Sequence, residues 1–144
     1  MATLTKNLFR GQGERDHRLD VIEGHWPTDV EGAVYVVGPD KREPDGHWFA
    51  ERGLLEKIHL VPDARGQVLV QHRVIDTPIQ RIKRRLGFLF RRIQFMEVSP
   101  FGVTNLANTN VQSIDGRMFV GYDAGRPIEV DPETLRFITP VGSN

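Results

Sequence analysis

The 144-residue chain contains no cysteine. Thiolate catalysis, disulfide bonds and cysteine-based zinc or iron–sulfur sites are therefore excluded. Long apolar runs are also missing: none approaches the roughly 18 residues of a membrane-spanning helix, and residues 1–15 lack the apolar stretch of a secretory signal. We therefore expect a soluble, cytoplasmic chain, with peripheral membrane contact as a second option.

Net charge is absent as well, because 19 Lys and Arg balance 19 Asp and Glu. The charges are unevenly distributed, since residues 81–92 contain six basic side chains and no acidic one. With these six set aside, 13 basic groups remain against 19 acidic ones. One short segment is thus strongly basic, while the rest of the chain is mildly acidic.

The 14 glycines and 9 prolines indicate frequent turns between short strands. Asp115-Gly116 lies between two apolar runs and predicts a tight β-hairpin, and within residues 67–75 one face is apolar apart from His72. The pattern predicts an all-β fold, either a sandwich, a barrel or a propeller. We expect the strands at residues 33–37, 54–61, 67–75, 111–114, 117–120, 128–130 and 137–139.

Residues 79–93 interrupt this pattern with apolar side chains at helical spacing and basic side chains off that stripe. Such a basic amphipathic insert can lie in a membrane interface, with arginines on lipid phosphates. The alternatives are a helix packed on the sheets with a solvated basic face, and nucleic-acid binding, which no recognition motif supports. The candidate lipid contacts are Arg81, Lys83, Arg84, Arg85, Leu89, Phe90, Arg91 and Arg92.

Five motifs, in order across residues 20–142, resemble those of the carotenoid cleavage oxygenases. Residues 24–35 resemble the opening G-x-x-P-x-x-x-x-G-x-x-Y pattern of that family. The others are Gly38-Pro39-Asp40, His47-Trp48-Phe49, Asn108-Thr109-Asn110-Val111 and Asp131-Pro132-Glu133-Thr134-Leu135. The chain also departs from the family at residues 50–54, where Ala-Glu-Arg-Gly-Leu replaces the usual Asp-Gly-Asp-Gly-Met.

The resemblance implies a seven-bladed β-propeller with a non-haem Fe(II) bound by four histidines, which cleaves a double bond of a carotenoid or apocarotenoid with dioxygen into two carbonyl products. Seven blades need about 300 residues, so this chain matches only the N-terminal part. We expect an N-terminal arm at residues 1–20, an incomplete propeller at residues 21–144, and no activity from the fragment alone. The alternative is a non-enzymatic β module that binds a membrane surface or a partner through residues 79–93.

Few candidate site residues remain. No histidine of the chain falls on a family ligand position. His47 and Glu51 could share a helical face as metal ligands, but Trp48-Phe49 and the resemblance indicate strand and turn there, and His59 with His72 lacks the further ligand that a metal site needs. Asp123 stands where the family has a glutamate whose carboxylate accepts a hydrogen bond from an iron-ligating histidine. Asp is one methylene shorter than Glu. The alternative is therefore that Asp123 is an ordinary turn aspartate before Gly125.

Overall fold

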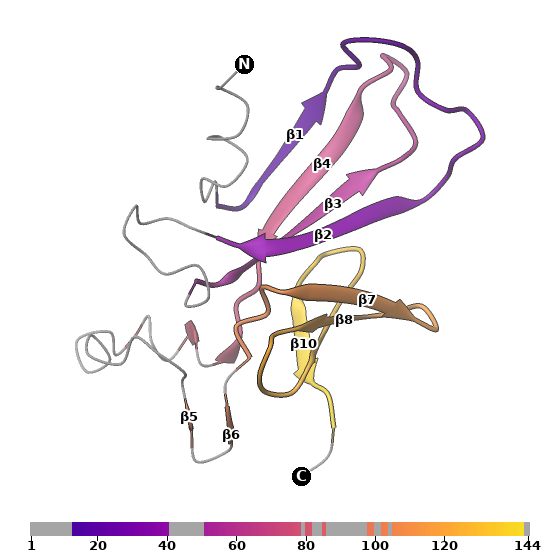
Figure 1. The fold of residues 1–144 in the computed structure, drawn as a ribbon. Coiled ribbons are helices and arrows are strands. Elements are labelled where there is room, and N and C mark those ends of the chain that lie inside the picture. The colour runs from indigo at the N-terminus through magenta and orange to yellow at the C-terminus, as the bar shows by residue number, and fades with distance from the viewer. Residues whose placement is uncertain are drawn as a thin grey trace.

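The computed structural model describes residues 13–40, 51–78, 80, 81, 85, 98–99, 102–103 and 105–142. The described chain is built from strands, which confirms the all-β prediction (Figure 1). The strands are β1 (Arg15–Leu19), β2 (Ala33–Pro39), β3 (Gly53–His59), β4 (Val68–Val74), β5 (Val98–Ser99), β6 (Gly102–Val103), β7 (Asn110–Ile114), β8 (Arg117–Gly121), β9 (Ile128–Val130) and β10 (Phe137–Pro140).

The first sheet has the order β1-β4-β3-β2, with every neighbouring pair antiparallel. The predicted hairpin of residues 54–61 and 67–75 is confirmed as β3 and β4. The alternation in β4 is confirmed too, because Val68, Val70, His72 and Val74 are buried while the residues between them are only half-buried. β1 closes the outer edge of this sheet, with Arg15 opposite His72 and Leu19 opposite Val68.

The second sheet has the order β10-β9-β8-β7, so it is a simple meander. Its first turn is the predicted Asp115-Gly116 hairpin, in which both residues adopt positive φ angles of 51° and 75°. This pair of angles is that of a type I′ turn, whose twist matches the twist of the strands on either side. The two sheets thus share one plan, four antiparallel strands each, which is the plan of a propeller blade.

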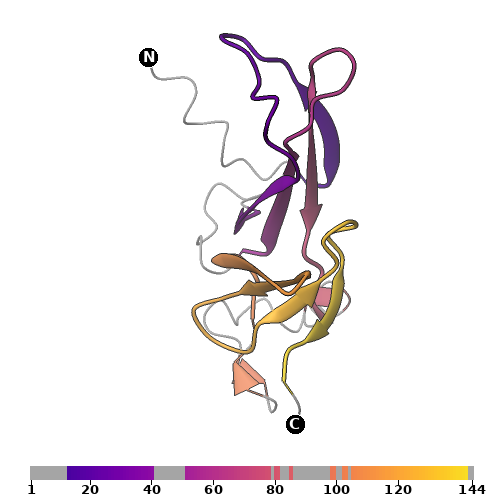
Figure 2. The same cartoon turned by 90° about the vertical axis from the view of Figure 1, so that its right-hand side faces the viewer.

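The core lies between the two sheets. Leu55 of β3 and Ile75, which follows β4, pack with a cluster from the second sheet, and Tyr35 and Val37 of β2 border it. Figures 1 and 2 both place the first sheet above the second. The two sheets meet where β2 contacts β7. The second sheet and its flanking segments contribute Ala107, Met118, Val120, Ile128, Val130 and Leu135.

Between the sheets in sequence lie elements that the structure describes only in part. β5 and β6 form a small antiparallel pair, and Pro78, Gln80, Arg81 and Arg85 are helical. In the described part of the chain, no helix has the length and apolarity needed to cross a membrane. Residues 15–19 of the expected N-terminal arm form β1, and the domain boundary at residue 20 stays a prediction.

Candidate functional site

The two sheets are joined by a close backbone contact between Gly53 and the segment before β7. The Gly53 amide donates to the Leu106 carbonyl oxygen at 2.9 Å, and the Ile75 amide donates to the Gly53 carbonyl oxygen at 2.8 Å. A Cβ on residue 53 would lie 1.7 Å from the carbonyl oxygen of Ala107. Only glycine therefore allows this approach, which explains why Gly53 is kept where the rest of the surrounding motif differs from the family pattern.

The Asn105–Thr109 segment fixes the loop that follows β8. The Asn105 Nδ2 donates to the carbonyl oxygens of Val120 at 3.2 Å and Arg126 at 2.7 Å, while its Oδ1 accepts from the Ala107 amide at 2.6 Å. Thr109 donates through Oγ1 to the Gly121 carbonyl oxygen at 3.1 Å. Carbonyl groups at both ends of residues 121–126 are thereby held, so the loop between them has a defined position.

Asn108, from the family-like Asn108–Val111 motif, joins this segment to the first sheet. Its Nδ2 donates to the carbonyl oxygen of Glu51 at 2.8 Å, and the residue is buried. Ala107, between the two asparagines, is fully buried at a φ of 56°, a left-handed conformation that is costly for a residue with a Cβ. The side-chain bonds on either side hold the backbone in this conformation.

The Asp131–Leu135 turn closes the same junction from the second sheet. The Asp131 Oδ1 accepts from the Thr134 amide at 2.6 Å and from the Glu133 amide at 3.0 Å, and these bonds lower the pKa of Asp131. The turn presents the Pro132 carbonyl oxygen to the Tyr35 hydroxyl at 3.1 Å and to the Lys57 Nζ at 3.1 Å. The motif thus has a structural role, because its hydrogen bonds attach the second sheet to the first.

Asp123 lies in the bend of the loop that Asn105 and Thr109 hold, and its side chain is exposed. Burial raises the pKa of the neighbouring Tyr122, and the charge of Asp123 raises it further. The position is that of a carboxylate presented to solvent at the end of β8. It can accept a hydrogen bond from a donor that approaches from outside the described residues.

Among the residues that the structure describes, the histidines contact polar groups and each other rather than a common centre. His59 Nε2 lies 2.9 Å from Gln71 Oε1, and the rings of His17 and His72 are in tilted contact with centroids 4.8 Å apart. Within the described ranges, no three His, Cys, Asp or Glu side chains converge as metal ligands. His47 lies outside the described residues.

Of the eight candidate lipid contacts, the structure describes Arg81 and Arg85, both of them exposed. The Arg81 guanidinium is already engaged, because it bonds to the Asp76 carbonyl oxygen at 3.1 Å and lies 5.7 Å from the centre of the Phe137 ring. Lys83, Arg84, Leu89, Phe90, Arg91 and Arg92 lie outside the described residues.

Comparison with known proteins identifies the family of this chain. The family model of the retinal pigment epithelial membrane protein matches residues 8–143. The chain belongs to this carotenoid oxygenase family, of which it represents the N-terminal part. It is 31% identical to carotenoid cleavage dioxygenase 7 of Oryza sativa over 92% of its own length and 25% of that protein. It is 25% identical to the apocarotenoid-15,15'-oxygenase of Synechocystis over 87% of its length and 28% of that protein.

The fold agrees with that assignment. The structure of cobalt-substituted Synechocystis apocarotenoid oxygenase superposes with a TM-score of 0.69 at 22% identity, covering 90% of this chain and 29% of that one. The two four-stranded sheets are thus blades of a partial propeller, as predicted. The chain spans about a quarter of the length of its curated relatives. Sequence reasoning missed Asn105 and Lys57, because a buried polar side chain leaves no periodic signal.

Proposed function

We propose that this chain supplies the first two blades of a non-haem Fe(II) dioxygenase that cleaves a carotenoid or apocarotenoid double bond into two carbonyl products. The match to the family across residues 8–143, on a structure of two complete blades, carries the proposal. The iron would supply the activation of dioxygen, and its ligands would come from the remaining blades. The described residues contribute a scaffold, and we propose that the chain alone is inactive.

Within that enzyme, we propose that Asp123 is a positioning residue. Its carboxylate would accept a hydrogen bond from an imidazole N–H of a blade that this chain lacks, and so fix the tautomer and orientation of that ring. The loop that carries Asp123 is suited to this because Asn105 and Thr109 bind its two ends. A fixed carboxylate orients a partner better than a loose one.

A chimera tests the proposal directly. Residues 13–142 would replace the matching segment of the Synechocystis apocarotenoid oxygenase, and the chimera and the isolated chain would be compared for Fe(II) content and apocarotenoid cleavage. We expect iron and turnover in the chimera and neither in the chain alone. Stoichiometric iron with turnover in the chain alone would refute the scaffold role, and a folded chimera with iron-free blades would refute the family function.

The Asp123 role has its own comparison in the same chimera. Asp123→Asn should lower kcat and iron content, while Asp123→Glu should restore both, since it returns the longer carboxylate of the family. Gly125→Ala, two residues away, controls for changes in the loop itself. Equal activity of the Asn and Glu variants would show that Asp123 is only a turn residue.

We also propose a cytoplasmic location with peripheral membrane contact through residues 79–93, on the strength of their basic amphipathic sequence. Co-sedimentation with anionic and with neutral vesicles would measure it. Reversing the charges of Arg84, Arg85, Arg91 and Arg92 should abolish binding to anionic vesicles, whereas Arg18→Glu on the first sheet should not. Unchanged binding in the charge-reversed chain would rule out this contact surface.

A further inference from the structure

Two histidines in ring contact link the edge strand β1 to β4. His17 of β1 and His72 of β4 place their ring centroids 4.8 Å apart with an interplanar angle of 37°. His72 is 6% exposed, and neither of its ring nitrogens forms a hydrogen bond of normal geometry, although Nδ1 lies 3.2 Å from the Glu56 Oε1. The His17 Nδ1 is buried without a hydrogen bond as well. Two imidazoles packed in this way are stable only while both are neutral.

Burial and the neighbouring arginines oppose protonation of the pair, whereas the charge of Asp16 favours it. Arg15 and Asp16 precede His17 on β1, Arg73 follows His72 on β4, and Glu56 faces His72 from β3. Burial first, and then His17, Arg15 and Arg73, lower the pKa of His72 to about 4, while burial and Arg15 lower the pKa of His17. Burial also raises the pKa of Glu56, so this carboxyl loses its charge earlier in acid than an ordinary glutamate. It therefore compensates an imidazolium poorly.

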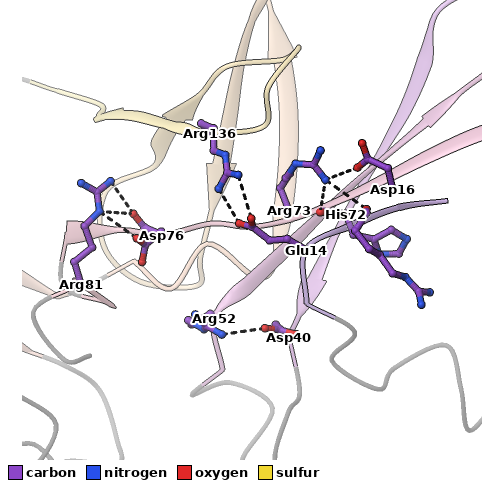
Figure 3. A network of polar contacts seen from close by, with 10 residues as sticks. Glu14, Asp16, Asp40, Arg52, His72, Arg73, Asp76, Arg81 and Arg136 are labelled. Carbon is purple, nitrogen blue, oxygen red and sulfur yellow. Dashed lines mark hydrogen bonds and ion pairs between the residues drawn. The ribbon is translucent and has the colours of Figure 1, made fainter. Parts of the chain in front are cut away.

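The other contacts of β1 persist over the pH range in which the imidazoles gain a proton. Asp16 pairs with Arg73, and Arg18 pairs with Asp63 at 2.7 Å (Figure 3 shows the first of these). Hydrogen bonds to Arg73 and to the amides of Gln67 and Arg65, respectively, lower the pKa values of Asp16 and Asp63. These carboxylates keep their charge while the imidazoles titrate, so the histidine pair responds first as the pH falls.

We infer that His17 and His72 form an acid-sensitive latch, which holds β1 on the edge of the first sheet at neutral pH and releases it when an imidazole is protonated. Release would also break the paired hydrogen bonds from Arg136 to Glu14 at 2.7 and 3.0 Å, which tie the start of β1 to the second sheet (Figure 3). It would leave the backbone edge of β4 unpaired and open to another strand. The inference is independent of the proposed enzymatic function.

The direction and size of the pH effect on β1 opening follow from the linkage between protonation and stability. The folded pKa of His72 lies below the unfolded value of 6.5, so its contribution is complete above that value and is lost as the pH falls toward about 4. For this one group, opening of β1 should become about 50-fold more frequent between about pH 7 and about pH 4.5. Amide hydrogen exchange, expressed as protection factors for residues 15–19, measures this opening.

Matched variants test the mechanism. In the chain carrying His17→Gln and His72→Gln, the ratio of protection between the two pH values should fall to within about threefold, whereas His25→Gln, an exposed histidine, should keep the wild-type ratio. The amides of β8 should stay protected in every case. A wild-type ratio that survives in the double variant, or loss of β8 protection in parallel with β1, would overturn the latch. Titration of His72 by NMR gives a check without any variant, since an ordinary imidazole pKa would also overturn it.

Discussion

Replacement of Gly53 by alanine tests whether the junction between the blades depends on close backbone contact. The added Cβ would lie 1.7 Å from the Ala107 carbonyl oxygen and 3.3 Å from the Ile75 Cδ1. Relief of the first contact requires the backbone to separate by well over an ångström, which stretches the Gly53 to Leu106 hydrogen bond of 2.9 Å. Overpacking together with one weakened buried hydrogen bond should cost about 3 kcal/mol of unfolding free energy.

Urea denaturation followed by circular dichroism measures this cost. With an m-value of about 1.5 kcal/mol/M, the midpoint should fall by about 2 M urea. Gly38→Ala is the matched control, because a Cβ there would meet no atom within 4 Å. Its midpoint should stay near that of the wild type, with a change of less than about 0.5 kcal/mol. Equal midpoints for Gly53→Ala and Gly38→Ala would refute the close-contact argument.

Three further substitutions probe the same architecture. Asn105→Ala removes three hydrogen bonds from a buried side chain and should destabilise the chain by about 3 kcal/mol in urea denaturation, and an unchanged midpoint would show that the loop after β8 is held by other contacts. Gly116→Ala places a Cβ at a φ of 75° in the hairpin turn and should cost about 1 kcal/mol, with Gly38→Ala again as the control. Glu133→Gln removes the charged partner of the buried Lys57 Nζ at 2.8 Å, and the loss should be below about 1 kcal/mol, since Glu133 is largely exposed. A large, salt-independent loss for Glu133→Gln would contradict that assignment.

The strands that sequence reasoning found are those with strong local signals. The Asp115-Gly116 turn is set by the backbone preferences of two residues, and β4 by the alternation of four buried positions, so neither needs knowledge of the rest of the fold. β1 was missed because Arg15–Leu19 is polar and mostly exposed. Its strand conformation comes from pairing with β4, far along the chain, which no local pattern encodes.

The candidate site was predictable to a different extent. Resemblance to the family indicated Asp123 and the Asp131–Leu135 turn, but not the contacts that give them a position. Asn105 binds the Arg126 carbonyl oxygen across the loop, and Gly53 meets Ala107 between the sheets. The Asn105 contact depends on how the segment before β7 packs on the loop after β8, and the Gly53 contact on how the two blades are placed against each other. Long-range placement of this kind is invisible to composition and periodicity.

The hydrogen bonds that hold the loop after β8 limit how far the carboxylate of Asp123 can reach. The carboxylate of Asp123 ends about one carbon–carbon bond closer to the backbone than a glutamate would. A loose loop could move outward and restore the reach, but Thr109 holds this loop at Gly121 and Asn105 holds it at Arg126. In the proposed role, the imidazole of the missing blade must therefore approach the loop, or a water molecule must bridge the two groups. Loosening the loop with Asn105→Ala in the chimera should then change the response to Asp123→Glu, whereas independent effects of the two substitutions would show that the loop anchors do not set this distance.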